Sequence, residues 1–337
     1  MEWIKYHEKE KVFELKTKNS TYQMQVREYD TLVHLYYGSP VGDTLITDRI
    51  IGVDRGFSGN PYEAGKDKTF SLDTLPQEYT AYGNGDYRIN GLETEQADRS
   101  DTANLKYECY EISKGKYSLK GLPAMFAKED EAETLEIVLK DHASGLRAHL
   151  LYGVFPQLDV ITRAVRLENT GTAPVTVKKA MSMEMDYEYR KLDAVHFYGK
   201  HNMERQMERT HLGHGNWSVG SIRGTSSHHH NPFVILCDRH TEETHGDCYG
   251  FALAYSGNFI FETEVDQVGH TRVEMGINPY HFSWTLENGD IFETPEVIMT
   301  YSAEGFGKLS RNYHDAYRSN LIRSKYVNQP RPILVNN

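Results

Sequence analysis

The residues whose type most directly suggests chemistry are three consecutive histidines, His228, His229 and His230. Neutral imidazole is a common metal ligand, but alternate side chains of a strand point to opposite faces, so only His228 and His230 could share one face. No cysteine or carboxylate stands nearby at the spacing of a metal-binding motif. We therefore expect no metal site here, but a polar loop that ends at Asn231-Pro232.

The cysteines and the N-terminus bear on the cellular compartment. Cys109, Cys237 and Cys248 cannot all pair with one another. Residues 1–5 do not combine a basic region with a following apolar stretch, as a secretion signal would. Both features favour reduced thiols in a cytoplasmic protein.

Charge and aromatic content narrow the ligand class. The net charge of −11 argues against nucleic acid or an anionic membrane as partner, and the longest apolar runs, such as residues 233–237, are too short to span a bilayer. A neutral ligand fits best. The 23 tyrosines would suit stacking on sugars, although strand-rich proteins also favour tyrosine.

Strand-like patterns dominate the chain up to about residue 301. Short runs of alternating and β-branched residues, separated by Asn-Gly and similar turn signals, indicate an all-β sandwich; examples are residues 22–26, 32–37, 135–139, 160–167 and 296–301. Residues 48–102 form a long irregular segment rich in Gly, Asp and Asn. Its scattered aromatic residues predict that the segment is ordered and functional.

The pattern changes at the C-terminal end. Apolar residues at spacings of three and four predict a helix of about five turns, which Pro330 and Pro332 end; they are Phe306, Leu309, Tyr313, Ala316, Tyr317 and Leu321. Ile333-Leu334-Val335 then resembles the first buried strand of a further domain, or else an edge strand of the sandwich. We expect a β domain over 1–304, a linker helix over 305–328, and the start of a barrel strand in 329–337.

Several segments, in order along nearly the whole chain, resemble the family-36 α-galactosidases. They include Asp54-Arg55-Gly56-Phe57-Ser58 and Arg331-Pro332-Ile333-Leu334, and in full they cover residues 54–61, 70–79, 144–146, 154–163, 223–233, 276–280 and 331–337. Each segment alone is a generic turn or strand pattern, whereas all of them in this order are specific to the family.

The resemblance implies a β-supersandwich of galactose mutarotase-like architecture, followed by a catalytic (β/α)8 barrel and a small β domain. The implied reaction is retaining hydrolysis of terminal α-galactosides such as melibiose and raffinose. It needs two carboxylates roughly 5–5.5 Å apart, which the family carries on a barrel of about 250 residues. We therefore expect no catalytic residue, cofactor or metal in this chain, and no hydrolysis by the chain alone.

The same resemblance suggests residues that contact substrate. The loop carrying Asp54 and Phe57 reaches an active site in the family, that of a neighbouring subunit of a tetramer. Asp54 would accept hydrogen bonds from vicinal hydroxyls, or it could cap a turn or pair with Arg55. Lys68 stands where relatives have arginine, and it could donate to a hydroxyl without the bidentate geometry of a guanidinium.

A second stretch, residues 199–205, resembles a family segment that usually reads Gly-x-Trp-x-Arg-Glu-Arg. Here His201 replaces the tryptophan that lies at the sugar pocket, which leaves a smaller stacking face. Glu204 and Arg205 are expected to form a structural ion pair. Trp217 and Trp284 are expected in the hydrophobic core.

Three hypotheses follow for function. The leading one is an enzyme portion that provides scaffold and oligomer contacts and supplies the Asp54 loop to a pocket shared with its own barrel. The alternative is a free-standing carbohydrate-binding module for galactosides. A third is an aldose epimerase, in which His281 and Glu296 would be the acid and base.

Overall fold

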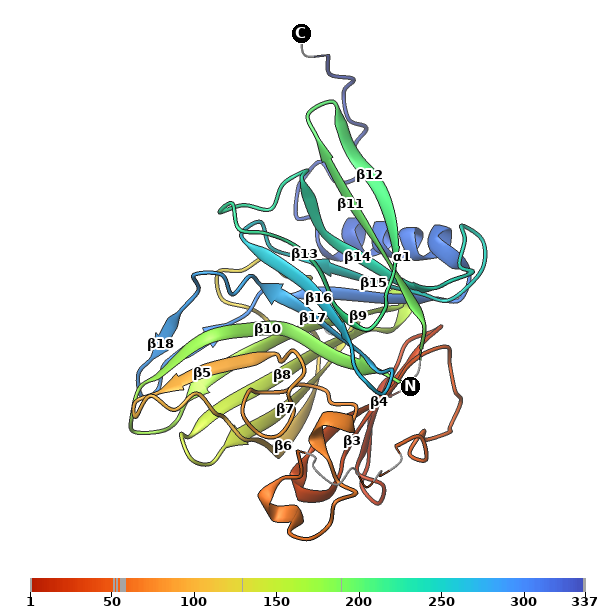
Figure 1. The fold of residues 1–337 in the computed structure, drawn as a ribbon. Coiled ribbons are helices and arrows are strands. Elements are labelled where there is room, and N and C mark those ends of the chain that lie inside the picture. Colours follow the sequence, from red (N-terminus) through yellow and green to blue (C-terminus); the bar gives the residue numbers. More distant parts are fainter. Residues whose placement is uncertain are drawn as a thin grey trace.

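The computed structural model describes residues 2–50, 52, 54, 59–128, 130–188 and 190–335. Its regular elements are almost all antiparallel strands (Figure 1). The short 3-10 helices are η1 (Glu28–Asp30), η2 (Tyr62–Ala64), η3 (Leu72–Thr74) and η4 (Pro156–Leu158).

The strands form three sheets. The first has four strands, in the order β1 (Ile4–His7), β2 (Val12–Lys16), β3 (Thr21–Val26) and β4 (Leu32–Gly38). The second has six strands, β13 (Gly215–Ser221), β16 (Phe259–Val265), β17 (Thr271–Ile277), β10 (Val175–Tyr187) and β18 (Trp284–Leu286), with β5 (Leu92–Gln96) also paired to β10.

The third sheet has ten strands. In spatial order they are β12 (Met203–His211), β11 (Leu192–Lys200), β14 (His230–Asp238), β15 (Cys248–Leu253), β20 (Val297–Ser302), β9 (Val160–Asn169), β8 (Leu146–Phe155), β7 (Glu133–Asp141) and β6 (Leu105–Lys114), with β19 (Ile291–Glu293) paired to β9. Apolar residues from all three sheets share one core. The predicted all-β supersandwich is therefore confirmed.

Strand β10 shows why the core is continuous. Met183 and Met185 alternate with Glu184 and Asp186, so the two sets point to opposite faces. The two methionines enter the main core. The polar set is also buried, because the segment around residues 77–91 covers that face instead of water.

Buried Arg272 holds this covering segment in place. Its guanidinium donates from Nε to Asp186 Oδ1 and from Nη2 to Asp86 Oδ2, each at 2.8 Å, and from Nη1 to the Ile89 carbonyl at 2.8 Å. Burial alone would raise the pKa of Asp186, but the positive charges of Arg272 and Arg88 hold it below its ordinary value. The predicted order of this segment is therefore confirmed for residues 59–102, which the structure describes throughout.

A second buried ion pair joins the four-stranded sheet to the ten-stranded one. Glu78 Oε1 lies 2.9 Å from Arg163 Nη1 of β9, and Glu78 Oε2 lies 3.0 Å from His34 Nδ1 of β4. The hydroxyls of Tyr22 and Tyr152 donate to the same carboxylate at 2.5 and 2.7 Å. Every charge in this network is therefore matched, as burial requires.

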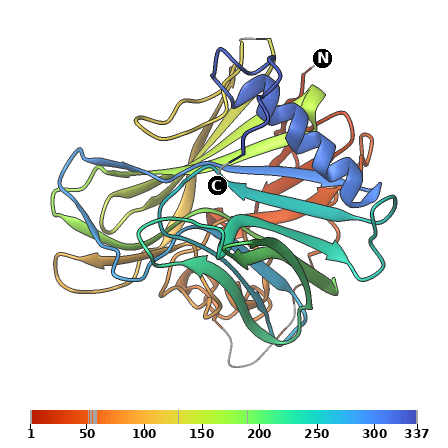
Figure 2. The same ribbon diagram turned by 90° about the horizontal axis from the view of Figure 1, so that it is seen from above.

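The C-terminal helix α1 (Gly305–Asn320) lies across β15 and β20 (Figures 1 and 2). Leu309, Tyr313 and Ala316 are buried against the sheet, and the Tyr313 hydroxyl donates to the Ile298 carbonyl at 3.0 Å. The helix ends at Asn320, short of the predicted 328, because the amide of Ile322 bonds the carbonyl of Tyr317 at 2.9 Å and closes the last turn.

The apolar triplet near the C-terminus is exposed. Ile333, Leu334 and Val335 are 97%, 87% and 77% accessible, and none of them is paired to a strand in the described ranges. The alternative of an edge strand of the sandwich is therefore wrong in this structure. Within the same ranges, no helix is long and apolar enough to cross a membrane.

The Arg272 network leads to a stability prediction. Replacing Arg272 with Met leaves the carboxylates of Asp86 and Asp186 buried with much of their compensating charge gone, so the free energy of unfolding should fall by about 3–5 kcal/mol. Urea denaturation at neutral pH measures this change. The matched control is Arg318→Met, because Arg318 and Asp315 are both largely exposed, and it should change stability by less than about 0.5 kcal/mol. Equal effects of the two substitutions would contradict a structural role for Arg272.

Candidate functional site

Two of the predicted contact residues lie in the segment between β4 and η3. Asp54 and Lys68 are both exposed, and Asp54 engages in at least one interaction of its own. Lys68 forms no ion pair with another described residue. Phe57, the third predicted residue of this loop, lies outside the described residues. Asp54 and Lys68 thus lie at the surface, while the chain that follows η3 is anchored by Arg272 through Asp86 and Ile89.

The fourth predicted residue, His201, occupies the turn of the β11–β12 hairpin. Position 199 requires glycine, because a Cβ atom there would lie only 2.3 Å from the carbonyl oxygen of Met203. Most of the hairpin is exposed, including Tyr198 and Met207. The expected Glu204–Arg205 ion pair is not formed: the Glu204 carboxylate instead accepts the Asn202 amide at 3.0 Å, which closes the turn.

The fold separates these two groups. The β11–β12 hairpin projects at one end of the molecule, beside the C-terminal segment, whereas β3, β4 and the chain that follows them lie at the other end (Figure 1). Within one chain, therefore, the Asp54 segment and His201 do not meet in one pocket.

The prediction that the three histidines lie in a loop ending at Asn231-Pro232 is wrong, because strand β14 begins at His230. Pro232 lies where the pairing of β11 with β14 is irregular, which a residue without an amide hydrogen can tolerate. His229 Nδ1 lies 3.1 Å from Arg223 Nη1. The described residues contain no cluster of three or more His, Cys, Asp or Glu side chains that could hold a metal ion.

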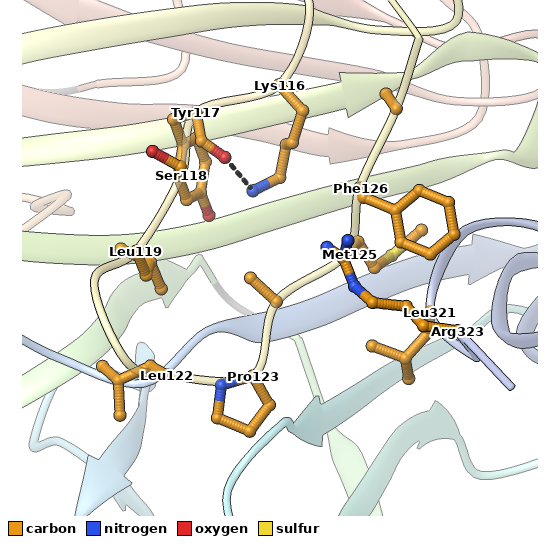
Figure 3. Close-up of a pocket in the computed structure, with 12 residues that line it drawn as sticks. Lys116, Tyr117, Ser118, Leu119, Leu122, Pro123, Met125, Phe126, Leu321 and Arg323 are labelled. Carbon is orange, nitrogen blue, oxygen red and sulfur yellow. Dashed lines mark hydrogen bonds between the residues drawn. The ribbon is translucent and has the colours of Figure 1, made fainter.

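Glu296, the carboxylate considered for an epimerase, is a structural residue. It is fully buried, its Oε2 lies 2.5 Å from Lys116 Nζ, and its Oε1 accepts the Met125 amide at 2.7 Å. Burial lowers the pKa of Lys116 to about 8, against the opposing effect of Glu296. The loop from Lys116 to Phe126 surrounds a hollow of about 500 Å³ beside this pair (Figure 3). His281 is exposed and makes an edge-to-face contact with Tyr280. The exposed His281 and the buried Glu296 therefore do not form an acid–base dyad.

A larger apolar groove lies between α1 and the end of the ten-stranded sheet. It has a volume of about 640 Å³. Phe197 and Met207 of the hairpin, Phe233 of β14, and Phe306 and Tyr317 of α1 line it. Sequence patterns predicted the helix but not the groove, because the groove forms only where β11, β14 and α1 meet.

Glu188 is a titratable residue that the sequence patterns did not single out. It follows β10, and partial burial raises its pKa to about 7, helped by the charge of Asp186 and opposed by that of Arg49. A shift of this kind marks candidate functional residues. No sequence signal distinguishes Glu188, because its burial depends on how the end of β10 packs.

The chain resembles the β-rich N-terminal region of glycoside hydrolases. The model of the glycosyl hydrolase family 36 N-terminal domain matches residues 30–287, and the Melibiase model matches residues 291–337. The chain therefore belongs to glycosyl hydrolase family 36. The sequence resemblance is confirmed.

The relatives are α-galactosidases. The bifunctional alpha-galactosidase/sucrose kinase AgaSK of Mediterraneibacter gnavus is 50% identical over 99% of this chain and 36% of its own length. Alpha-galactosidase AgaA of Geobacillus stearothermophilus is 42% identical over 99% of this chain and 46% of its own. The galactosidase domain of AgaSK superposes with a TM-score of 0.96 over 98% of this chain and 46% of that chain. This chain thus spans less than half the length of these relatives.

Glu188 should make stability depend on pH. Its pKa of about 7 in the folded protein exceeds the ordinary 4.5, so the folded state binds the extra proton between these values and stability falls as pH rises through that range. Glu188→Gln should remove this fall and stabilise the protein at pH 8 by about 1–2 kcal/mol, allowing for the residue's partial exposure. Urea denaturation at several pH values tests this. Wild type and variant should be equally stable at pH 4, and a parallel pH dependence of the two would refute the assignment.

Proposed function

We propose that this chain is the N-terminal part of an α-galactosidase that hydrolyses terminal α-galactosides such as melibiose and raffinose with retention of configuration. The observation that carries the proposal is the match of family 36 along the chain, supported by α-galactosidase relatives at 42–50% identity. One structure of AgaA, at 43% identity and a TM-score of 0.94, is in complex with raffinose.

The proposed partner of the chain is its own catalytic barrel. The Melibiase match runs through α1 into the exposed triplet Ile333-Leu334-Val335. Three apolar side chains at 77–97% exposure have no stabilising contact of their own. As the first strand of a parallel barrel, the triplet would be buried on both faces, and the barrel would carry the two catalytic aspartates.

The groove between α1 and the sheet is the proposed seat of that barrel. Residues of β11, β12 and α1 line it, and the β11–β12 hairpin lies beside the C-terminal segment (Figure 1). Phe233, Phe306 and Tyr317 offer apolar surface, while Arg205 and Glu243 at its rim offer polar contacts. This arrangement of apolar centre and polar rim is common at protein interfaces.

Two chains are needed for the proposed sugar pocket. The β11–β12 hairpin, which carries His201 at its turn, lies beside the C-terminal segment, whereas β3 and β4 lie at the other end of the molecule (Figure 1). In an oligomer, a tetramer by family resemblance, the Asp54 segment of one subunit would complete the pocket that the neighbouring subunit forms with its own barrel and His201. In this arrangement the chain acts as scaffold, oligomer contact and substrate-binding element.

We further propose a cytoplasmic location. All three cysteines are free thiols. Cys237 and Cys248 face each other across β14 and β15, and burial raises the pKa of Cys248 to about 12, which keeps it protonated and unreactive.

A polypeptide of these 337 residues should not hydrolyse α-galactosides. The buried carboxylates of Glu78, Asp86 and Asp186 are engaged by arginine, and Glu296 is engaged by Lys116, so none is available as nucleophile or acid. Release of nitrophenol from p-nitrophenyl-α-galactoside should equal that of buffer, with a full-length family member as positive control. Steady turnover by the purified polypeptide would refute the proposal.

In the full-length enzyme, Asp54→Asn should lower kcat/KM for raffinose by about 10–100-fold, because the loss of one charge-assisted hydrogen bond is worth about 1.5–3 kcal/mol. Asp43→Asn is the matched control, because Asp43 lies in the same segment and is fully exposed. Its one ion pair with a described residue is the long contact of 3.6 Å between its Oδ1 and Lys16 Nζ. The control should retain activity, and both variants should keep the oligomeric state. Unchanged raffinose kinetics in Asp54→Asn would exclude Asp54 from the pocket.

A further inference from the structure

We infer that the chain carries a carbohydrate site centred on Trp284. Trp284 was expected in the core, but it is 52% exposed. It lies on β18, at the side of the molecule away from the β11–β12 hairpin and the C-terminal segment (Figures 1 and 2). An exposed tryptophan of this kind requires an explanation, because so large an apolar surface is usually buried or used for binding.

The aromatic side chains form a platform. Phe292 lies between Trp284 and Phe282, with ring centres 5.6 and 5.7 Å away. Phe282 and Phe292 pack against the main core, so they anchor the indole while about half of Trp284 stays accessible. A sugar ring stacks on such a face through its C–H groups.

Polar groups surround the platform where sugar hydroxyls would lie. The hollow beside Trp284 has a volume of about 550 Å³ and is lined by Lys120, Arg166, Asp290 and Glu293. Arg166 donates only its Nε to Glu293, at 2.9 Å, so within the described part of the chain its two terminal nitrogens keep their donor capacity. The ammonium of Lys120 is exposed. Donors and carboxylate acceptors at the edge of an aromatic face can together bind a neutral polyhydroxyl ligand.

The site is held rigid before any ligand arrives. Strand β18 belongs to the six-stranded sheet and β19 to the ten-stranded one, and the turn between them is fixed by buried Asn169. The side-chain amide of Asn169 donates to the Leu286 carbonyl at 2.8 Å. The backbone carbonyl of Asn169 accepts the Gly289 amide at 2.7 Å, and its backbone amide donates to the Asp290 carbonyl at 3.1 Å. A preformed site loses less conformational entropy on binding.

The ligand class is an oligosaccharide with a terminal galactosyl unit, and this choice of sugar rests on the proposed function. The axial hydroxyl on the fourth carbon of galactose leaves one ring face with contiguous C–H groups, which suits a flat indole. The Trp284 site would therefore hold a galactoside on the surface of this chain.

The 337-residue chain is titrated with raffinose and with stachyose, and binding is measured by calorimetry and by saturation-transfer NMR. Trp284→Ala should lower the association constant by about tenfold or more, corresponding to about 1.4 kcal/mol. Trp284→Phe should retain it within about threefold. Tyr62→Ala, which removes an exposed aromatic ring from another part of the surface, should have no effect.

Three outcomes would overturn the inference. Raffinose binding that survives Trp284→Ala would exclude the platform, as would absence of binding by the wild type. Light scattering that shows a dimer becoming monomeric in Trp284→Ala, without loss of raffinose binding, would assign the surface to contact with a second copy. Failure of the proposed function is recognised separately, because it would appear in the Asp54→Asn kinetics of the full-length enzyme and not in this titration.

Discussion

A buried guanidinium is the constraint on which much of this structure depends. Arg272 is fully inaccessible to water, and an isolated charge in that position would be strongly unfavourable. It is tolerated because Asp186 of its neighbouring strand and Asp86 of an irregular segment both face it. The irregular segment therefore stays on the sheet, because its departure would take away the bonds that Arg272 makes with Asp86 and with the Ile89 carbonyl.

The buried ion pair between Glu78 and Arg163 is a second place where matched charges hold separate parts of the chain together. It draws together a residue of the covering segment, strand β9 of the ten-stranded sheet, and Tyr22 and His34 of the small N-terminal sheet. Apolar packing would hold these layers together in many relative positions, whereas a network of directional bonds accepts few. Polar residues in the interior thus define how the sheets are arranged.

A rigid scaffold of this kind suits a protein that presents residues to other surfaces. The groups available for binding lie on projecting or peripheral elements: the Asp54 segment, the turn of the β11–β12 hairpin, the groove beside α1 and the Trp284 platform. They face different directions. Under the proposed function, an assembly with a barrel and further subunits would bring the first three together.

Local patterns in the sequence predict the class of fold, the position of the C-terminal helix and the family. These depend on alternation within a strand, on spacing within a helix and on short motifs, which involve residues close together in the chain. Residue type did not decide which apolar or charged side chains would be buried. Trp284 is exposed, Glu204 bonds a backbone amide instead of Arg205, and Glu188 acquires a raised pKa. Only the tertiary structure decided these points, because burial and charge pairing are set by strands that meet from distant parts of the chain, as when Arg272 meets Asp86 across 186 positions.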